Sequence, residues 1–130
     1  PTGFESKFHD MAAPKLTGIT ISTNSVNTNS GDVEIDVTVS GTDNLSGISS
    51  VYIGFRSPGG NQYVNKYLSL TSGTNLNGTF TGKITFKQYC EAGEWQINAL
   101  QLHDKVSNSL SLGNSDLTTM GFGLTVTVEE

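Results

Sequence analysis

The chain has 130 residues, and its 7 basic and 12 acidic side chains give a formal net charge of −5. This length predicts a single domain that buries roughly two-thirds of the surface of its unfolded chain. The charge balance excludes the basic stripe that a nucleic-acid-binding protein needs, and no apolar run approaches the roughly 20 residues of a membrane span. We therefore expect neither a nucleic-acid partner nor a membrane span.

Residues 1–13 show no hydrophobic periodicity and are interpreted as a linker or tether. Residues 14–130 form the predicted domain, which Pro14 opens in an extended geometry. Within it, apolar and polar residues alternate with the period of two that is typical of strands with one buried face. The alternation predicts strands around residues 16–22, 33–39, 48–56, 62–70, 79–87, 94–103 and 123–130.

Local signals refine this pattern. A slip at Gly18 predicts a bulge in the first strand, and a change of phase near Ala99 predicts a bulge or a change of sheet. The run Ser-Pro-Gly-Gly-Asn at residues 57–61 predicts a hairpin turn, and residues 115–120 predict one helical turn with Ser115 as N-cap. Because no long helical period appears, we predict an all-β fold, a sandwich of seven to eight strands.

Two side chains, Cys90 and Trp95, are interpreted as structural rather than functional. Cys90 is the only cysteine, so no internal disulfide forms, and a thiolate nucleophile needs an activating base that neither His9 nor His103 supplies from nearby in the sequence. We interpret Cys90 as buried and inert, and Trp95 as a core residue rather than a binding anchor. The sequence lacks a Gly-x-Ser-x-Gly elbow, a phosphate-binding loop and a helix-borne His pair. We predict that the domain is not an enzyme.

Four segments carry short loop motifs, each different from the others. They are an acidic residue before Ala-Pro at residues 10–14, Thr-Asp-Asn-Leu-Ser-Gly-Ile with a following Ser-Val-Tyr at 42–52, Tyr-Cys-Glu-Ala-Gly-Glu-Trp at 89–95, and Leu-His-Asp-Lys-Val-Ser-Asn at 102–108. In this order they resemble the bacterial immunoglobulin-like modules of secreted and cell-surface proteins, with Val106 and Ser107 in place of an Ala-Gly pair. The resemblance implies an immunoglobulin-like antiparallel β-sandwich, a secreted or cell-surface location, and neighbouring domains of the same chain as partners.

The resemblance also predicts a cation site. In an immunoglobulin-like sandwich, the loop after the second strand and the loop before the last strand lie at one end, where the first strand begins. Six oxygen-bearing side chains would meet there: Asp10, Asp43, Asn44, Ser46, Asp104 and Asn108. Calcium takes about six to eight oxygen ligands, so we predict a low-affinity calcium site that stiffens the joint to a preceding domain. The alternative is that these residues form turns by bonding their own backbone.

A second candidate site is aromatic. Tyr52, Arg56, Tyr63 and Tyr67 are predicted on the outward sides of neighbouring strands. Aromatic rings beside polar groups can stack on the apolar faces of pyranose rings, which predicts binding of polysaccharide or cell-surface glycan. The alternative is that these are ordinary strand residues that pair across the sheet.

Two functions follow from these sites. The first is a non-catalytic immunoglobulin-like accessory module that spaces, presents or attaches within a secreted or surface multidomain protein. The second is a carbohydrate-binding module appended to a polysaccharide-degrading enzyme.

Overall fold

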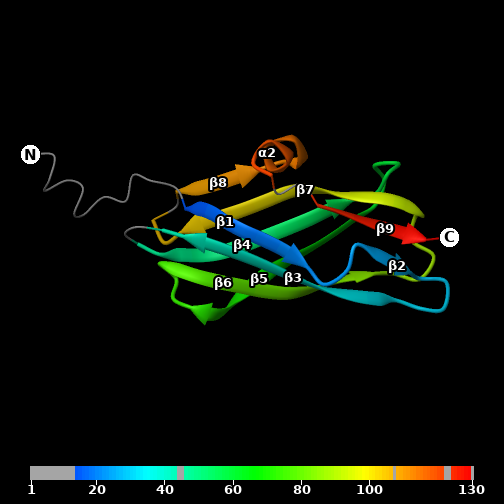
Figure 1. Cartoon of the computed structure of the whole chain (residues 1–130), viewed down its shortest axis with the longest axis horizontal. Helices are drawn as coiled ribbons and strands as arrows, with labels where there is room; N and C mark the ends of the chain where they lie inside the picture. Colours follow the sequence, from blue (N-terminus) through cyan, green and yellow to red (C-terminus); the bar gives the residue numbers. More distant parts are fainter. Residues whose placement is uncertain (1–13, 44–45, 107, 122–123, 130) are drawn as a thin grey trace, which may run out of the picture.

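The computed structural model describes residues 14–43, 46–106, 108–121 and 124–129 (Figure 1). The elements are β1 (Lys15–Ile21), β2 (Ser25–Asn27), β3 (Val33–Thr42), β4 (Ile48–Arg56), β5 (Tyr63–Gly73), β6 (Asn77–Phe86), β7 (Gly93–Asp104), β8 (Ser109–Leu112), α2 (Asn114–Thr119) and β9 (Thr125–Glu129). The all-β prediction is confirmed. β2 was not predicted from the sequence, because three residues are too few to show an alternation.

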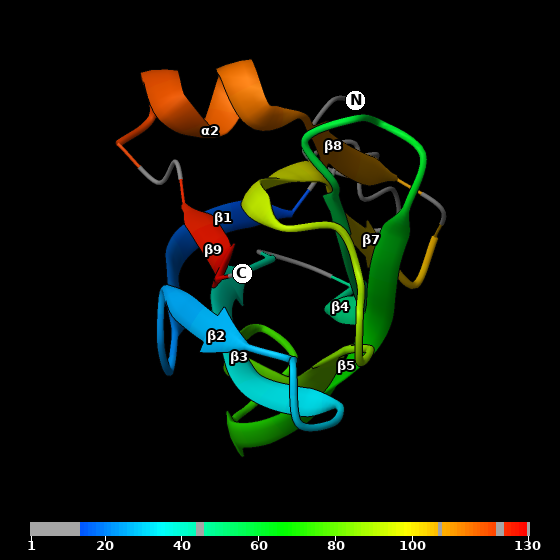
Figure 2. The same cartoon turned by 90° about the vertical axis from the view of Figure 1, so that its right-hand side faces the viewer.

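The strands form two layers, and β5 belongs to both. β1, β3 and β6 pair in this order in one layer, and β4, β7 and β9 pair in the other. β5 pairs with β4 up to Leu68 and with β6 from Ser69 onward, so the sheet curls around its interior (Figure 2). This is the strand order of an immunoglobulin sandwich, and the predicted fold class is confirmed. The short β2 adds a parallel pair with β9 to the antiparallel pairs.

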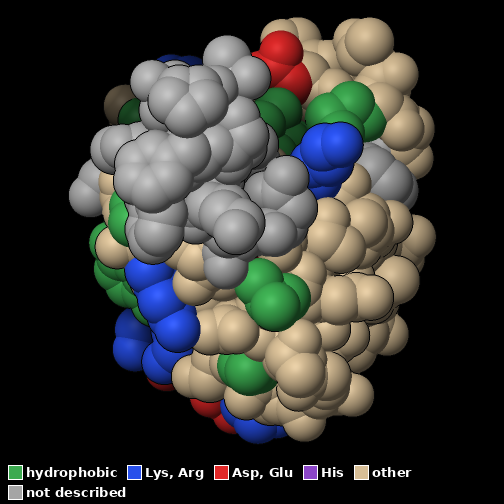
Figure 3. All heavy atoms as spheres, turned by 90° about the vertical axis from the view of Figure 1, so that its left-hand side faces the viewer, with side chains coloured by type: hydrophobic (Ala, Val, Ile, Leu, Met, Phe, Trp, Pro, Cys, Tyr) green, Lys and Arg blue, Asp and Glu red, His purple; other side chains and the backbone are tan. Residues whose placement is uncertain are grey.

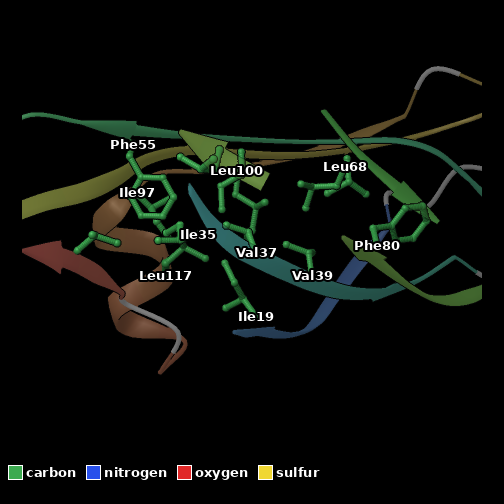
Figure 4. Packing of buried hydrophobic residues seen from close by; sticks show 14 of the residues in the cluster. Ile19, Ile35, Val37, Val39, Phe55, Leu68, Phe80, Ile97, Leu100 and Leu117 are labelled. Atoms are coloured by element: carbon green, nitrogen blue, oxygen red, sulfur yellow. The ribbon is translucent and has the colours of Figure 1, made fainter. Parts of the chain in front are cut away.

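The core lies between the two layers. The inward side chains of β3, among them Val37 and Val39, face those of β4 and β7, such as Phe55 and Leu100 (Figure 4). All four are fully buried, whereas the residues that alternate with them in β3 are exposed or half-buried. Burial of a large apolar side chain contributes about 1.5–3 kcal/mol, so this alternation is the main local determinant of the fold.

The predicted helical turn exists, but its cap was assigned to the wrong residue. α2 begins at Asn114 after the N-cap Gly113, whose N–H donates to the Asp116 carboxylate at 3.0 Å. The N-cap is therefore Gly113 and not Ser115, and it has no side-chain oxygen that could accept an N–H of the first turn. β8 and β9 follow one another along one edge of β7, and α2 connects them. Leu117 of α2 is fully buried, which anchors the helix on the core.

Both predicted irregularities are confirmed. The register of β1 against β3 shifts between Leu16 and Gly18. The register of β7 against β4 shifts where Gly54 pairs with Ala99 and the next residue of β4 pairs with Ile97. Asn98 is therefore the extra residue of a bulge, which re-aims the outward side chains of β7.

The predictions that Trp95 and Cys90 are buried differ in their outcome. Trp95 is 1% exposed, and its indole N–H donates to the carbonyl of Glu91 at 2.8 Å, so the core prediction is confirmed. Cys90 is only partly buried, with its Sγ 3.9 Å from the Thr28 hydroxyl. No helix in the described part of the chain is long and apolar enough to span a membrane.

Asp32 ties the corner before β3 to the loop between β6 and β7. Its Oδ1 accepts the N–H of Gln88 at 2.8 Å, and its Oδ2 lies 3.5 Å from Nζ of Lys87. The hydrogen bond from the Gln88 backbone, with a smaller effect of the Lys87 charge, lowers the pKa of Asp32 below its usual 3.8. The charged form of Asp32 therefore stabilises the folded chain.

We predict that Asp32→Asn lowers the free energy of unfolding near neutral pH and has little effect well below pH 3.8. A carboxyl with a depressed folded pKa contributes stability above its unfolded pKa and loses it as the pH falls through the folded pKa. Urea unfolding of both proteins at the two pH values checks this. A deficit of the same size at acid pH would contradict it, because the charge is then absent from both proteins.

Candidate functional site

The structure brings Asp43 and Asp104 to the same end of the sandwich. Asp43 follows the end of β3, which lies beside the start of β1. Asp104 ends β7 and pairs with Ile48 at the start of β4. The N–H of Lys105 donates to the carbonyl of Gly47 at 3.1 Å, which joins the two loops. The predicted meeting of these two corners is confirmed, and we call this end the Asp104 pole.

At this pole the Asp104 carboxylate organises its own turn. Its Oδ1 accepts the backbone N–H groups of Val106 and Asn108 at 3.0 and 2.8 Å, and its Oδ2 accepts the Asn108 side-chain amide at 3.0 Å. The Ser49 hydroxyl donates to the Asp104 carbonyl at 3.0 Å. Asp104 is 3% exposed and Asp43 is 4% exposed. These contacts of Asp104 and Asn108 are those of the turn-forming alternative.

The other predicted ligands of calcium are placed only in part. Ser46 lies in the loop before β4 and is half-buried, while Asp10 and Asn44 lie outside the described residues. Within the described ranges, no group of three or more His, Cys, Asp or Glu side chains is placed to hold a metal ion. Seen from this end, the described surface is mainly uncharged, and acidic side chains show only near its rim (Figure 3). Calcium binding at the Asp104 pole stays a prediction.

The four residues of the aromatic candidate lie together on the outside of β4 and β5. Tyr52 pairs directly with Tyr67, and Arg56 pairs directly with Tyr63. Directly opposed residues of an antiparallel pair share one face of the sheet. The rings of Tyr52 and Tyr67 have centroids 4.9 Å apart with planes tilted by 54°, and Tyr63 and Tyr67 are 53% and 65% exposed. We call these four residues the tyrosine face.

A groove adjoins the tyrosine face between the turn after β4 and the start of α2. It encloses about 730 Å³. The side chains that line it are mainly polar: Arg56, Glu94, Gln96, Asn98, Asn114 and Ser115. Amides and hydroxyls both donate and accept hydrogen bonds, so this lining suits a ligand rich in hydroxyl groups.

Gly54 lies where the tyrosine face meets the groove. It stands between Tyr52 and Arg56 on the outward side of β4 and pairs with Ala99 of β7. A Cβ atom at Gly54 would lie 3.1 Å from Oδ1 of Asn98 and 3.8 Å from the Tyr52 hydroxyl oxygen. The Asn98 amide oxygen and the Tyr52 hydroxyl therefore both border the space over the glycine. The tyrosine face and the groove are adjacent parts of one surface on β4, β5 and β7.

The turn beside the groove is held by hydrogen bonds from several directions. The N–H of Ser57 donates to the carbonyl of Gln62 at 2.9 Å, and the Ser57 hydroxyl accepts the N–H of Gln62 at 3.0 Å. The N–H of Gly59 donates to the Glu91 carboxylate at 2.7 Å. Gly60 has φ 78°, a conformation that favours glycine. This wall of the groove is therefore preformed, which reduces the entropy that a ligand must overcome on binding.

The groove was not predicted from the sequence. Gln96 and Asn98 belong to the outward positions of β7, where amides recur up to Gln101. This recurrence of amides on one side of the strand is the feature of the sequence that could have indicated the groove. The position of Asn114 depends on where α2 packs, and no local pattern shows it.

A family model described as "Domain of unknown function (DUF7035)" matches residues 9–122. The chain belongs to this family. A comparison with curated proteins gave no match. The matched range includes the Asp104 pole, the tyrosine face and every residue named as lining the groove, so both candidate sites lie within the family's domain.

Proposed function

We propose that this domain is a non-catalytic immunoglobulin-like module of a secreted or cell-surface multidomain protein, and that it binds carbohydrate. The binding surface is the tyrosine face together with the groove. One observation carries this proposal: the ring pair of half-buried Tyr52 and exposed Tyr67 lies on the same surface as a groove lined by amide and hydroxyl groups.

The two parts of this surface match the two kinds of surface on a sugar. A pyranose ring is apolar above and below and polar at its rim. Tyr67 offers an exposed ring, and Asn98 and Asn114 offer amides that donate to and accept from hydroxyls. The groove volume of about 730 Å³ lies within the range of about 300–1,000 Å³ that is common for small-ligand sites.

The two poles of the sandwich are the places where neighbouring domains would join. β1 begins at the Asp104 pole, and β9 ends at the opposite pole (Figure 1). Domains joined at the two poles leave the outside of β4, β5 and β7 uncovered. The tyrosine face is then available to a glycan in a tandem arrangement of domains.

An alternative role for the tyrosine pair is to stabilise the sheet. A cross-strand aromatic pair contributes roughly 0.2–1 kcal/mol. Such a role requires neither the exposure of Tyr63 nor a neighbouring polar groove. Binding and stability therefore have to be measured on the same variants.

We predict that Tyr67→Ala weakens glycan binding by about tenfold or more while the thermal midpoint changes by only a few degrees, since exposed aromatic anchors dominate binding and contribute little to stability. Affinity electrophoresis of the unmodified domain across soluble polysaccharides first identifies a ligand, and the variant is then compared on it. Leu76→Ala is the control, because Leu76 is a large apolar side chain that is 45% exposed and lies between β5 and β6, outside the tyrosine face and the groove. The proposal fails if no polysaccharide retards the unmodified domain, or if both variants bind equally well.

A further inference from the structure

Arg56 occupies a defined place in the groove. It is the last residue of β4, and it pairs with Tyr63 on one side and with Gln96 on the other. Its guanidinium lies against Gly60, where a Cβ atom would lie 3.0 Å from both Cζ and Nε. A side chain other than hydrogen at this position would displace the guanidinium. The turn and Arg56 therefore fit together, and the charge is held at the wall of the groove.

This guanidinium is available to a ligand. Among the described residues, the ion pairs are Lys83 with Asp36 and Lys87 with Asp32, and Arg56 belongs to neither. An arginine stays charged at all ordinary pH values and presents a planar fork of N–H donors. That fork matches a carboxylate, which it binds through two parallel hydrogen bonds.

We propose that the groove selects an acidic sugar, whose carboxylate binds Arg56. The proposal rests on the carbohydrate-binding function proposed above and specifies its ligand class as a uronic or sialic acid residue. In this pose the carboxylate lies on the guanidinium and the sugar hydroxyls reach the amides of Asn98 and Asn114. The rest of the glycan extends over Tyr63, which pairs with Arg56.

The charges around the groove restrict this ligand to a few negative groups. Glu94 also lines the groove, and the whole chain carries a formal charge of −5. Both repel a dense polyanion, so attraction has to come from one carboxylate placed on Arg56. Binding through a single ion pair depends only weakly on salt, unlike binding through many phosphate or sulfate groups.

The experiment compares glycans that differ only in the carboxylate. Methyl galacturonoside is tested against methyl galactoside, and sialyllactose is tested against sialyllactose whose carboxyl group has been reduced. Arg56→Gln removes the charge, and Arg56→Lys keeps the charge without the planar fork. Lys66→Gln is the matched control, because it removes one positive charge from an exposed position of β5 that does not line the groove.

We expect at least one acidic probe to bind more tightly than its neutral counterpart. Arg56→Gln should weaken that binding by about 10- to 100-fold, Arg56→Lys by a smaller factor, and Lys66→Gln hardly at all. Equal binding of the acidic and neutral forms overturns this inference and leaves the carbohydrate-binding proposal intact. Equal losses for Arg56→Gln and Lys66→Gln overturn it as well. If neither acidic nor neutral glycans bind, the proposed function itself fails.

Discussion

Replacing Trp95 with alanine is expected to lower the free energy of unfolding by about 3–5 kcal/mol, because the change empties a large volume inside the core. Trp95 is 1% exposed and stands edge-on to Phe86, with ring centroids 5.3 Å apart. Phe86 in turn packs against Phe55 at 6.3 Å. The three rings connect the two layers, so the cavity falls where the layers meet. Native domains are stable by only about 5–15 kcal/mol, so this loss is a large part of the total.

A smaller change separates the ring contacts of Trp95 from its hydrogen bond. Trp95→Phe keeps an aromatic ring beside Phe86 but leaves the Glu91 carbonyl without its indole donor. We expect a loss of about 1–2 kcal/mol, smaller than that of the alanine variant. Urea unfolding gives the free energies of unfolding of the unmodified chain, Trp95→Ala and Trp95→Phe. Tyr89→Ala is an exposed aromatic control that should change this free energy by about 0.5 kcal/mol or less. Equal stability of Trp95→Ala and the unmodified chain would contradict the placement of Trp95 in the core.

Much of the fold was predictable because its determinants are local. The alternation from Val33 onward shows which side of β3 is buried, and the phase change near Ala99 shows the bulge of β7. The tyrosine face follows from one hairpin, since the turn at residues 57–61 sets the register that pairs Arg56 with Tyr63. Counting back along β4 and forward along β5 then pairs Tyr52 with Tyr67.

The remaining features depend on contacts between distant segments. β2 pairs with β9 across about 100 residues of sequence, and its three residues carry no pattern of their own. The groove combines the turn after β4 with the outward amides of β7 and the start of α2, whose place is fixed by the burial of Leu117. The meeting of Asp43 and Asp104 follows from the fold class. The bonding of Asp104 within its own turn follows only from the side-chain geometry.

Replacing Asp104 with alanine is expected to lower the free energy of unfolding by about 2–3 kcal/mol, since the N–H groups of Val106 and Asn108 both lose their acceptor in a partly buried turn. Asp104→Asn keeps one acceptor oxygen for these groups and should cost about 1 kcal/mol. Asp36→Ala is the control, because the ion pair of Asp36 with Lys83 is largely exposed, and exposed ion pairs contribute little to stability. A loss for Asp104→Ala no greater than that of Asp36→Ala would contradict the structural role of this turn.

The same variants decide the calcium prediction for the Asp104 pole. If the pole binds calcium, excess EDTA lowers the thermal midpoint of the unmodified domain, because a ligand that binds only the folded state stabilises it. Asp104→Asn then weakens or removes this dependence, since a neutral amide is a poorer ligand for a hard cation than a carboxylate. If Asp104 serves only its turn, EDTA leaves every midpoint unchanged, while alanine still destabilises more than asparagine. The carboxylate is then required for its geometry as an acceptor of the backbone N–H groups of Val106 and Asn108.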